Sequence, residues 1–118
     1  MGVFANGIGV VGSTTIDQVV DQHRSVAKVG GVTTYAAITY SRSGLNTFVV
    51  TNIANTDRTI IDKLEQENLT VFNGETSRTT QFINNIQSDF RRQKALRRAR
   101  PIQLQQLSNI VGRIGGLH

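Results

Sequence analysis

Between residues 8 and 72, short apolar runs alternate with turn-forming residues and with segments of helical spacing. Strands are predicted where β-branched residues gather, at 8–11, 16–20, 46–53 and 69–72. Helices are predicted at about 32–43 and after Asn55–Asp57, which supplies N-cap residues. The resulting order of strand, helix, strand, helix and strand predicts an α/β fold built as a partial Rossmann-like sheet with helices.

The two predicted helices differ in the residues that share a face. In the first, Val32, Tyr35, Ala36 and Tyr40 recur at helical spacing, and Gly44 stands where a C-cap belongs. In the second, the recurring residues are Ile60, Ile61, Leu64 and Asn68. Asn68 can adopt the left-handed conformation that glycine often takes after a helix.

From Ser77 onward the pattern changes to alternation of apolar and polar residues. The segment TTQFINNI, a polar turn and the segment RRQKALRRA predict two partly exposed antiparallel strands at about 79–86 and 91–99. Pro101 then closes this segment, and a short helix is expected at 102–107. Residues 111–116 have strand character for a few positions only.

Length and composition restrict the class of protein. A chain of 118 residues suits a single domain, here 1–118, and no apolar run has the ~20 residues that a membrane span needs. The start of the chain lacks the basic region of a signal peptide. The sequence contains no cysteine, which fits a reducing compartment. We therefore expect a cytoplasmic protein without a membrane partner.

The net charge of +5 comes largely from one segment. Six basic residues fall within ten positions, namely Arg91, Arg92, Lys94, Arg97, Arg98 and Arg100. Clustered cations bind nucleic-acid phosphates, but here no aromatic residues interleave with them and no known reading motif is present. The sequence therefore favours a solvated or ligand-facing strand over a nucleic-acid surface.

Gly7, Gly9 and Gly12 form the pattern G-x-G-x-x-G of dinucleotide-binding proteins. In that motif a helix opens directly after the glycines, so that its N-terminus meets the pyrophosphate. Here the strand-type run TTIDQVV follows instead. The sequence thus argues against a dinucleotide site.

A second glycine pair, Gly30-Gly31, comes directly before the first predicted helix. Glycines let a ligand approach the backbone, and the first N–H groups of a helix lack internal acceptors. Such a site suits a ligand with hydroxyls or negative charge. Asp17 ends the first strand region, where a carboxylate can accept hydrogen bonds from ligand hydroxyls, although its position alone favours a solvated turn aspartate.

His23 and His118 complete the candidates for chemistry. Neither has a nucleophile or an orienting acid at a recognisable spacing, and the two histidines do not make a metal site. We therefore assign no catalytic residue and no metal ligand.

Four segments together resemble the amino-terminal part of the ribokinase-like (PfkB) carbohydrate kinases: GVVGSTTIDQVV, KVGGVTTYAAITYSRSG, NTFVVTNIANTDRTIIDKL and TTQFINNIQSDFRRQ. Gly30, Gly31, Ala37 and Gly44 match the glycine signature of that family. At three positions this chain departs from the signature, with Thr33 at a Gly, Ala or Pro position, Tyr35 at the family Asn, and Ala54 at the last Gly.

The resemblance implies a sugar site and an antiparallel β lid. Asp17 would bind substrate hydroxyls, Gly30 and Gly31 would line the sugar pocket, and Tyr35 would replace the Asn that commonly contributes to it. The lid strands would occupy about 18–29 and 78–100, cover the sugar and often pair two subunits. In the lid, Arg91 and Arg92 are expected to contact a phosphorylated substrate or to face solvent.

Full-length relatives are ATP-dependent kinases, which implies ATP and Mg²⁺ as cofactors of the full-length family. Their carboxyl half holds a G-A-G-D segment with the catalytic base and the anion hole, and also the nucleotide site. The 118 residues contain no such segment. We therefore expect an amino-terminal kinase fragment that binds no cofactor and is inactive by itself. Its open sheet edge or its lid strands are expected to pair two copies into a homodimer. The alternative is a non-catalytic binding or dimerisation module derived from a sugar kinase.

Overall fold

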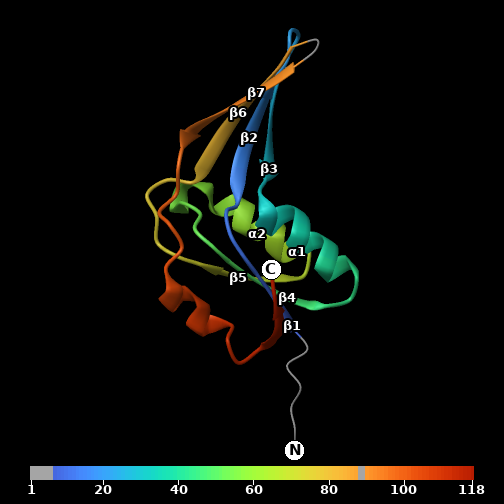
Figure 1. Cartoon of the computed structure of the whole chain (residues 1–118), viewed down its shortest axis with the longest axis vertical. Helices are drawn as coiled ribbons and strands as arrows, with labels where there is room; N and C mark the ends of the chain where they lie inside the picture. The colour runs from blue at the N-terminus through green and yellow to red at the C-terminus, as the bar shows by residue number, and fades with distance from the viewer. Residues whose placement is uncertain (1–6, 88–89) are drawn as a thin grey trace, which may run out of the picture.

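Two four-stranded sheets form the molecule, which we call the core and the lid (Figure 1). The structure is a computed structural model that describes residues 7–87 and 90–118. The core sheet has the order β5-β4-β1-β8, and all its pairs are parallel. Its strands are β1 (Gly7–Val11), β4 (Asn46–Thr51), β5 (Leu69–Asn73) and β8 (Ile114–Leu117).

The lid has the order β3-β2-β6-β7 and projects from one end of the core (Figure 1). It comprises β2 (Thr15–Val20), β3 (Ser25–Gly30), β6 (Thr80–Gln87) and β7 (Phe90–Arg97). Its two outer pairs are antiparallel hairpins, whereas the central pair β2–β6 is parallel. The lid is therefore a mixed sheet, and the predicted α/β fold with a lid is confirmed.

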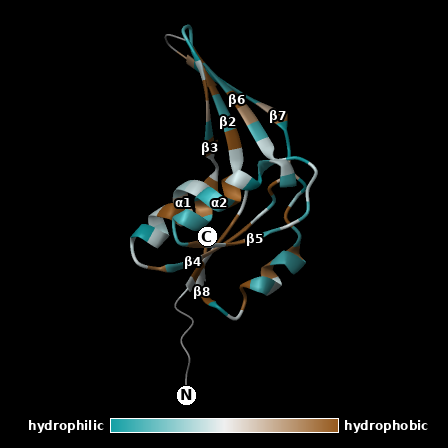
Figure 2. Cartoon of the chain, turned by 180° about the vertical axis from the view of Figure 1, so that it is seen from behind, coloured by the Kyte–Doolittle hydropathy of each residue, from teal (hydrophilic) through white to brown (hydrophobic). Residues whose placement is uncertain are grey.

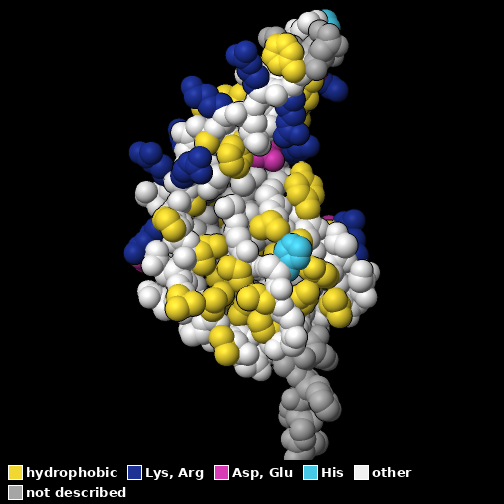
Figure 3. All heavy atoms as spheres, in the orientation of Figure 1, with side chains coloured by type: hydrophobic (Ala, Val, Ile, Leu, Met, Phe, Trp, Pro, Cys, Tyr) yellow, Lys and Arg dark blue, Asp and Glu magenta, His cyan; other side chains and the backbone are white. Residues whose placement is uncertain are grey.

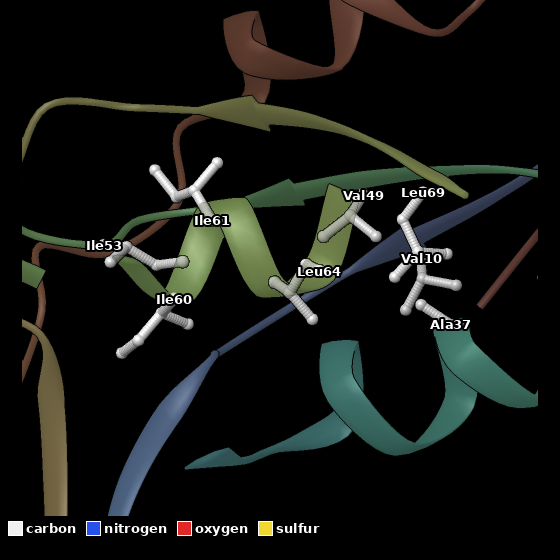
Figure 4. Packing of buried hydrophobic residues seen from close by; sticks show 8 residues of the cluster. All are labelled: Val10, Ala37, Val49, Ile53, Ile60, Ile61, Leu64 and Leu69. Atoms are coloured by element: carbon white, nitrogen blue, oxygen red, sulfur yellow. The ribbon is translucent and has the colours of Figure 1, made fainter. Parts of the chain in front are cut away.

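One face of the core sheet is covered by α1 (Val32–Arg42) and α2 (Arg58–Gln66). Helix α1 packs on β1 and β4, and α2 packs on β5. The side chains between them form the hydrophobic core (Figure 4), which comprises Val10, Ala37, Val49, Ile53, Ile60, Ile61, Leu64 and Leu69. Because β-branched and leucine side chains fill this layer, the two helices are held on the sheet mainly by apolar burial.

The opposite face is covered by the carboxyl-terminal segment, which contains the 3-10 helix η2 (Leu104–Asn109). Ile110 is 1% exposed, and a Cβ added to Gly9 would lie 2.7 Å from its Cδ1 atom. Gly9 therefore leaves room for a packed isoleucine. Since β2 and not a helix follows these glycines, the structure agrees with our rejection of a dinucleotide motif. Figure 2 shows hydrophobic colours concentrated in the core strands.

The predicted face of α1 is wrong at Val32 and Tyr35, whereas Ala36 and Tyr40 pack against the hydrophobic core as predicted. The residues that the helix buries are Thr33, Thr34 and Ala37, whereas Val32 and Tyr35 are 39% and 56% exposed. The pattern of apolar residues failed here because two buried threonines find hydrogen-bond partners. The hydroxyl of Thr34 donates to the carbonyl of Gly30 at 2.8 Å.

Three further local predictions need correction. Asn55–Asp57 forms the 3-10 turn η1 before α2, and Asp57 makes no side-chain cap; its carboxylate instead accepts a hydrogen bond from the Thr79 hydroxyl at 2.7 Å. The short carboxyl-terminal helix is a 3-10 helix that begins at Leu104, two residues later than expected. The last strand begins at Ile114, because the preceding residues form turns.

Strand β4 ends at Thr51 and not at residue 53, and Asp17 lies within β2 and does not end a strand. The predicted helix ends are confirmed. Helix α1 ends at Arg42, and Gly44 follows with a φ of 90°. Asn68 has a φ of 61°, the left-handed conformation that its place after α2 predicts. No helix in the described part of the chain is long and apolar enough to cross a membrane.

Side-chain amides tie the carboxyl ends of β4 and β5 together. The Ile53 N–H donates to Asn73 Oδ1 at 2.7 Å, and Asn73 Nδ2 donates to the Ile53 carbonyl at 2.8 Å. Asn73 thus continues the parallel pairing of the two strands after the ladder ends. Next to it, Gln106 Nε2 donates to Asn52 Oδ1 at 2.8 Å and attaches η2 to the same edge.

Replacing Asn73 by Ala is expected to destabilise the fold by about 2 kcal/mol or more, because both backbone groups of the buried Ile53 lose their partners. Urea unfolding followed by circular dichroism measures this change. Asn85→Ala on an exposed part of the lid is the control and is expected to stay within about 0.5 kcal/mol of the wild type. Equal stabilities for the two variants would contradict the assigned role of Asn73.

Candidate functional site

The lid hairpin β2–β3 leaves and re-enters the core at one point. Thr15, the first residue of β2, is in register with Gly30, the last residue of β3, and α1 begins two residues later at Val32. Gly12 to Thr14 lead from β1 into the hairpin. This point lies at the carboxyl edge of the core sheet, where parallel α/β sheets bind ligands.

Asp17 lies directly over the glycine pair. Its Oδ1 atom accepts a hydrogen bond from the Thr15 hydroxyl at 2.8 Å. A Cβ added to Gly30 would lie only 2.2 Å from Asp17 Oδ2, so the carboxylate occupies the space that a side chain at this position would fill. The structure therefore brings Asp17 and Gly30 together, and Thr15 orients the carboxylate.

Gly31 is the N-cap of α1 and has a φ of 90°. A Cβ here would lie 2.3 Å from the backbone oxygen of Ser13, so both conformation and space require glycine. No side chain caps the helix. The Thr34 N–H donates to the Gly31 carbonyl at 3.2 Å, whereas the Val32 and Thr33 N–H groups have no acceptor among the described residues. Helix donors and the Asp17 acceptor thus meet at one site, which suits a ligand whose hydroxyls both donate and accept hydrogen bonds.

Three buried threonines connect the bend after β1, the start of α1 and the end of β4 by hydrogen bonds. Thr14, Thr33 and Thr51 are each 0% exposed and come from the bend after β1, from α1 and from β4. The Thr14 hydroxyl bonds to that of Thr33 and, at 2.9 Å, to that of Thr51. Thr33 also donates to the Ser13 carbonyl at 3.0 Å. This network could not be predicted from the sequence, because threonines are common in strands and turns alike.

Tyr35, predicted to contact the substrate, is the fourth residue of α1 and is 56% exposed. Within the described residues its hydroxyl makes no hydrogen bond. Its backbone N–H donates to the Gly31 carbonyl at 3.2 Å, which places it one helical turn after the glycine pair. Its role as a substrate contact stays a prediction.

Arg91 and Arg92, which the sequence treats alike, lie on opposite faces of the lid because neighbouring strand residues alternate. By register, Arg91 shares its face with Asn84 and Asp17. Two guanidinium nitrogens of Arg91 donate to Asn84 Oδ1 at 2.8 and 3.2 Å, and Asn84 is 3% exposed. The Arg92 guanidinium instead lies 5.6 Å from the centre of the Phe90 ring. Of the two arginines, Arg91 therefore lies on the face of the glycine site, which it shares with Lys28, the β3 residue in register with Asp17.

A different carboxylate occupies the turn between β2 and β3. Asp21 Oδ1 accepts the backbone N–H groups of His23 and Arg24 at 2.7 and 2.9 Å. These two bonds stabilise the charged form and lower the pKa of Asp21 below its ordinary value. Asp21 is thus a turn residue and makes a suitable comparison for Asp17.

No protein-family profile matches the sequence, and no curated protein matches it. Solved structures, however, match the fold along most of the chain. A pyrophosphate-dependent kinase in the ribokinase family, complexed with a pyrophosphate analogue and myo-inositol, is 24% identical with a TM-score of 0.77. The match covers 86% of this chain and 35% of that one. This chain has the ribokinase-family fold.

Two other matches belong to the same group of kinases. The structure of a pyrophosphate-dependent myo-inositol kinase matches with a TM-score of 0.80 at 23% identity, over 94% of this chain and 37% of that one. Ribokinase from Thermotoga maritima matches with a TM-score of 0.65 at 20% identity. This match covers 76% of this chain and 36% of the ribokinase chain. The chain therefore spans about a third of the length of these kinases, in agreement with the predicted resemblance to their amino-terminal part.

Replacing Gly31 by Ala is expected to destabilise the fold by about 2 kcal/mol or more, because the new Cβ adds a clash with Ser13 to the strain of a positive φ. Gly44→Ala is the matched control, since Gly44 has the same φ of 90° but nothing within 4 Å of an added Cβ. Urea unfolding of both variants separates the two effects. Equal losses of stability would show that the approach to Ser13 has no cost.

Proposed function

We propose that this chain forms the hydroxyl-binding part of a PfkB-type carbohydrate kinase, and that its ligand is a sugar or a sugar-like polyol. The observation that carries the proposal is the Asp17 carboxylate held over the Gly30 backbone, at the uncapped start of α1. A carboxylate that accepts hydrogen bonds from two neighbouring hydroxyls distinguishes a polyol from water and from simple alcohols.

The mechanism at this site is binding and orientation. Asp17 accepts hydrogen bonds from ligand hydroxyls, and the first N–H groups of α1 donate to ligand oxygens. Strands β2 and β6 extend from the same edge of the core (Figure 1). In the proposed function the lid closes over the ligand and excludes water from it. Arg91 lies on this side of the lid and would meet an anionic group on the ligand. Myo-inositol, which one matching kinase binds, is a suitable first ligand.

Phosphoryl transfer itself needs groups that the 118 residues do not include. The family resemblance places the catalytic base and the anion hole in a G-A-G-D segment, and the sequence has none. We therefore propose that this chain alone binds the polyol, binds neither ATP nor Mg²⁺, and does not phosphorylate. Its place of action is the cytoplasm, in keeping with the absence of cysteine.

Asp17→Asn is expected to weaken binding of myo-inositol at least about tenfold, because a neutral amide replaces the charged acceptor of two hydroxyls. Ligand-observed NMR titration of the wild type and the variant measures the change. Gly30→Ala is expected to give a similar loss, since its Cβ would displace the Asp17 carboxylate.

The control for this titration is Asp21→Asn, which changes charge equally but lies in the lid turn. Its affinity for myo-inositol should equal that of the wild type. If the wild type binds neither myo-inositol nor ribose, or if both Asp variants lose affinity alike, the proposed polyol site is wrong.

A second function, assembly into a homodimer, is favoured by the edges of the lid. Strands β3 and β7 are its outer strands, and each has an edge that pairs with no other strand among residues 7–87 and 90–118. Apolar side chains accompany these edges, since Val26 is 47%, Phe90 53% and Leu96 44% exposed. An open strand edge with apolar side chains is suited to pair with a second copy of the chain.

Val26→Lys is expected to convert the dimer to a monomer, because a lysine on an edge strand opposes pairing with another strand. Size-exclusion chromatography with light scattering should give twice 12.9 kDa for the wild type and 12.9 kDa for the variant. Leu104→Lys, at an 82% exposed position on η2, is the control and should remain dimeric. A monomeric wild type at high micromolar concentration would contradict the lid dimer.

A further inference from the structure

A cavity of about 1050 Å³ lies at the side of the core opposite to β8, between α2, the end of β5 and the segment that joins β7 to η2. None of the residues of the glycine site lines it. Its apolar wall is formed by Ile53, Ile61 and Val71. The cavity is therefore a second concave site, and its volume suits a small molecule.

Three arginines from different parts of the chain line this cavity. Arg58 is the first residue of α2, whereas Arg98 and Arg100 follow β7. Within residues 7–87 and 90–118 one ion pair shorter than 4 Å is present, between Arg42 and Glu67. None of the three cavity arginines therefore forms an ion pair with a carboxylate there. Figure 3 shows basic side chains continuing from the lid down the flank of the molecule. Unpaired arginines around a cavity favour an anionic ligand.

The backbone that carries two of these arginines is fixed in place. The Ala99 N–H donates to the Thr80 hydroxyl at 3.0 Å, and the Arg100 N–H donates to the Thr76 hydroxyl at 2.9 Å. The Arg100 carbonyl accepts from Asn52 Nδ2 at 2.7 Å. Because these bonds hold the segment before any ligand arrives, less conformational freedom is lost on binding.

Hydroxyl, amide and carboxylate side chains complete the wall of the cavity. Thr76, Ser77 and Asn55 supply hydroxyls and an amide, and Glu65 and Glu75 supply carboxylates. The carboxylates disfavour a ligand that is anionic throughout, but they accept hydrogen bonds from hydroxyls. The cavity thus combines guanidinium groups for an anion with acceptors for hydroxyls.

We propose that this cavity binds a phosphorylated small molecule that also carries hydroxyls, at a site separate from the glycine site. Arg98 and Arg100 bind its phosphate, since guanidinium forks match phosphate oxygens, and Arg58 adds positive charge from the facing helix. Nucleic acid is a poorer match, because the lining contains no aromatic side chain on which a base could stack.

The experiment titrates the full 118-residue chain with ribose 5-phosphate by isothermal calorimetry. Arg98→Gln/Arg100→Gln is expected to lower the affinity at least about tenfold, because both phosphate contacts lose their charge. The control Arg24→Gln/Arg92→Gln removes the same charge from the lid, leaves Arg91 in place and should retain the affinity. Inorganic phosphate should compete for the same site.

Asp17→Asn separates this proposal from the polyol site, since it should leave ribose 5-phosphate binding unchanged. Loss of binding in Asp17→Asn alone would place the ligand at the glycine site and overturn the proposal. Equal losses in the two arginine double variants, or binding that does not saturate, would also overturn it. Binding of a DNA duplex would also overturn the proposal if both double variants weakened it equally. That result would indicate an extended surface for phosphates in place of one cavity.

Discussion

The close approach of the Gly30-Gly31 backbone to the bend after β1 is the constraint on which the site depends. At Gly31 an added Cβ would lie 2.3 Å from the Ser13 oxygen, and at Gly30 it would lie 2.2 Å from the Asp17 carboxylate. Because neither glycine carries a side chain, the end of β3 can lie beside the beginning of β2, and α1 can start at the same place. One steric condition therefore positions the lid hairpin, the helix N-terminus and the carboxylate together.

Side-chain hydrogen bonds gather at the carboxyl ends of the core strands, on the same edge of the sheet as the glycine pair. The threonine hydroxyls beneath the bend, the Asn73 amide beside Ile53 and the Thr79 hydroxyl all satisfy groups where regular strand pairing stops. Buried polar groups without partners would be costly, so these side chains allow the sheet to end in loops that approach one another closely. The apolar layer between α1, α2 and the sheet stabilises the fold. The hydrogen bonds at the polar edge fix the conformation of the loops there.

Much of the fold follows from local patterns, since the strands of the core are β-branched runs and Ile60, Ile61 and Leu64 mark the buried face of α2. The same rule failed on α1, where buried threonines rather than Val32 and Tyr35 face the sheet. Hydroxyl pairs such as Thr14 and Thr51 are far apart in sequence, so no local pattern could predict them. Likewise, the separation of Arg91 from Arg92 depends on strand register, which needs the partner strand.

The lid joins the core through chain segments that lie close together at its base (Figure 1). Asp17 is the third residue of β2, next to this base, whereas Arg91 is near the turn at the far end of the lid. Any rotation of the lid about its base would therefore displace the Arg91 guanidinium further than the Asp17 carboxylate.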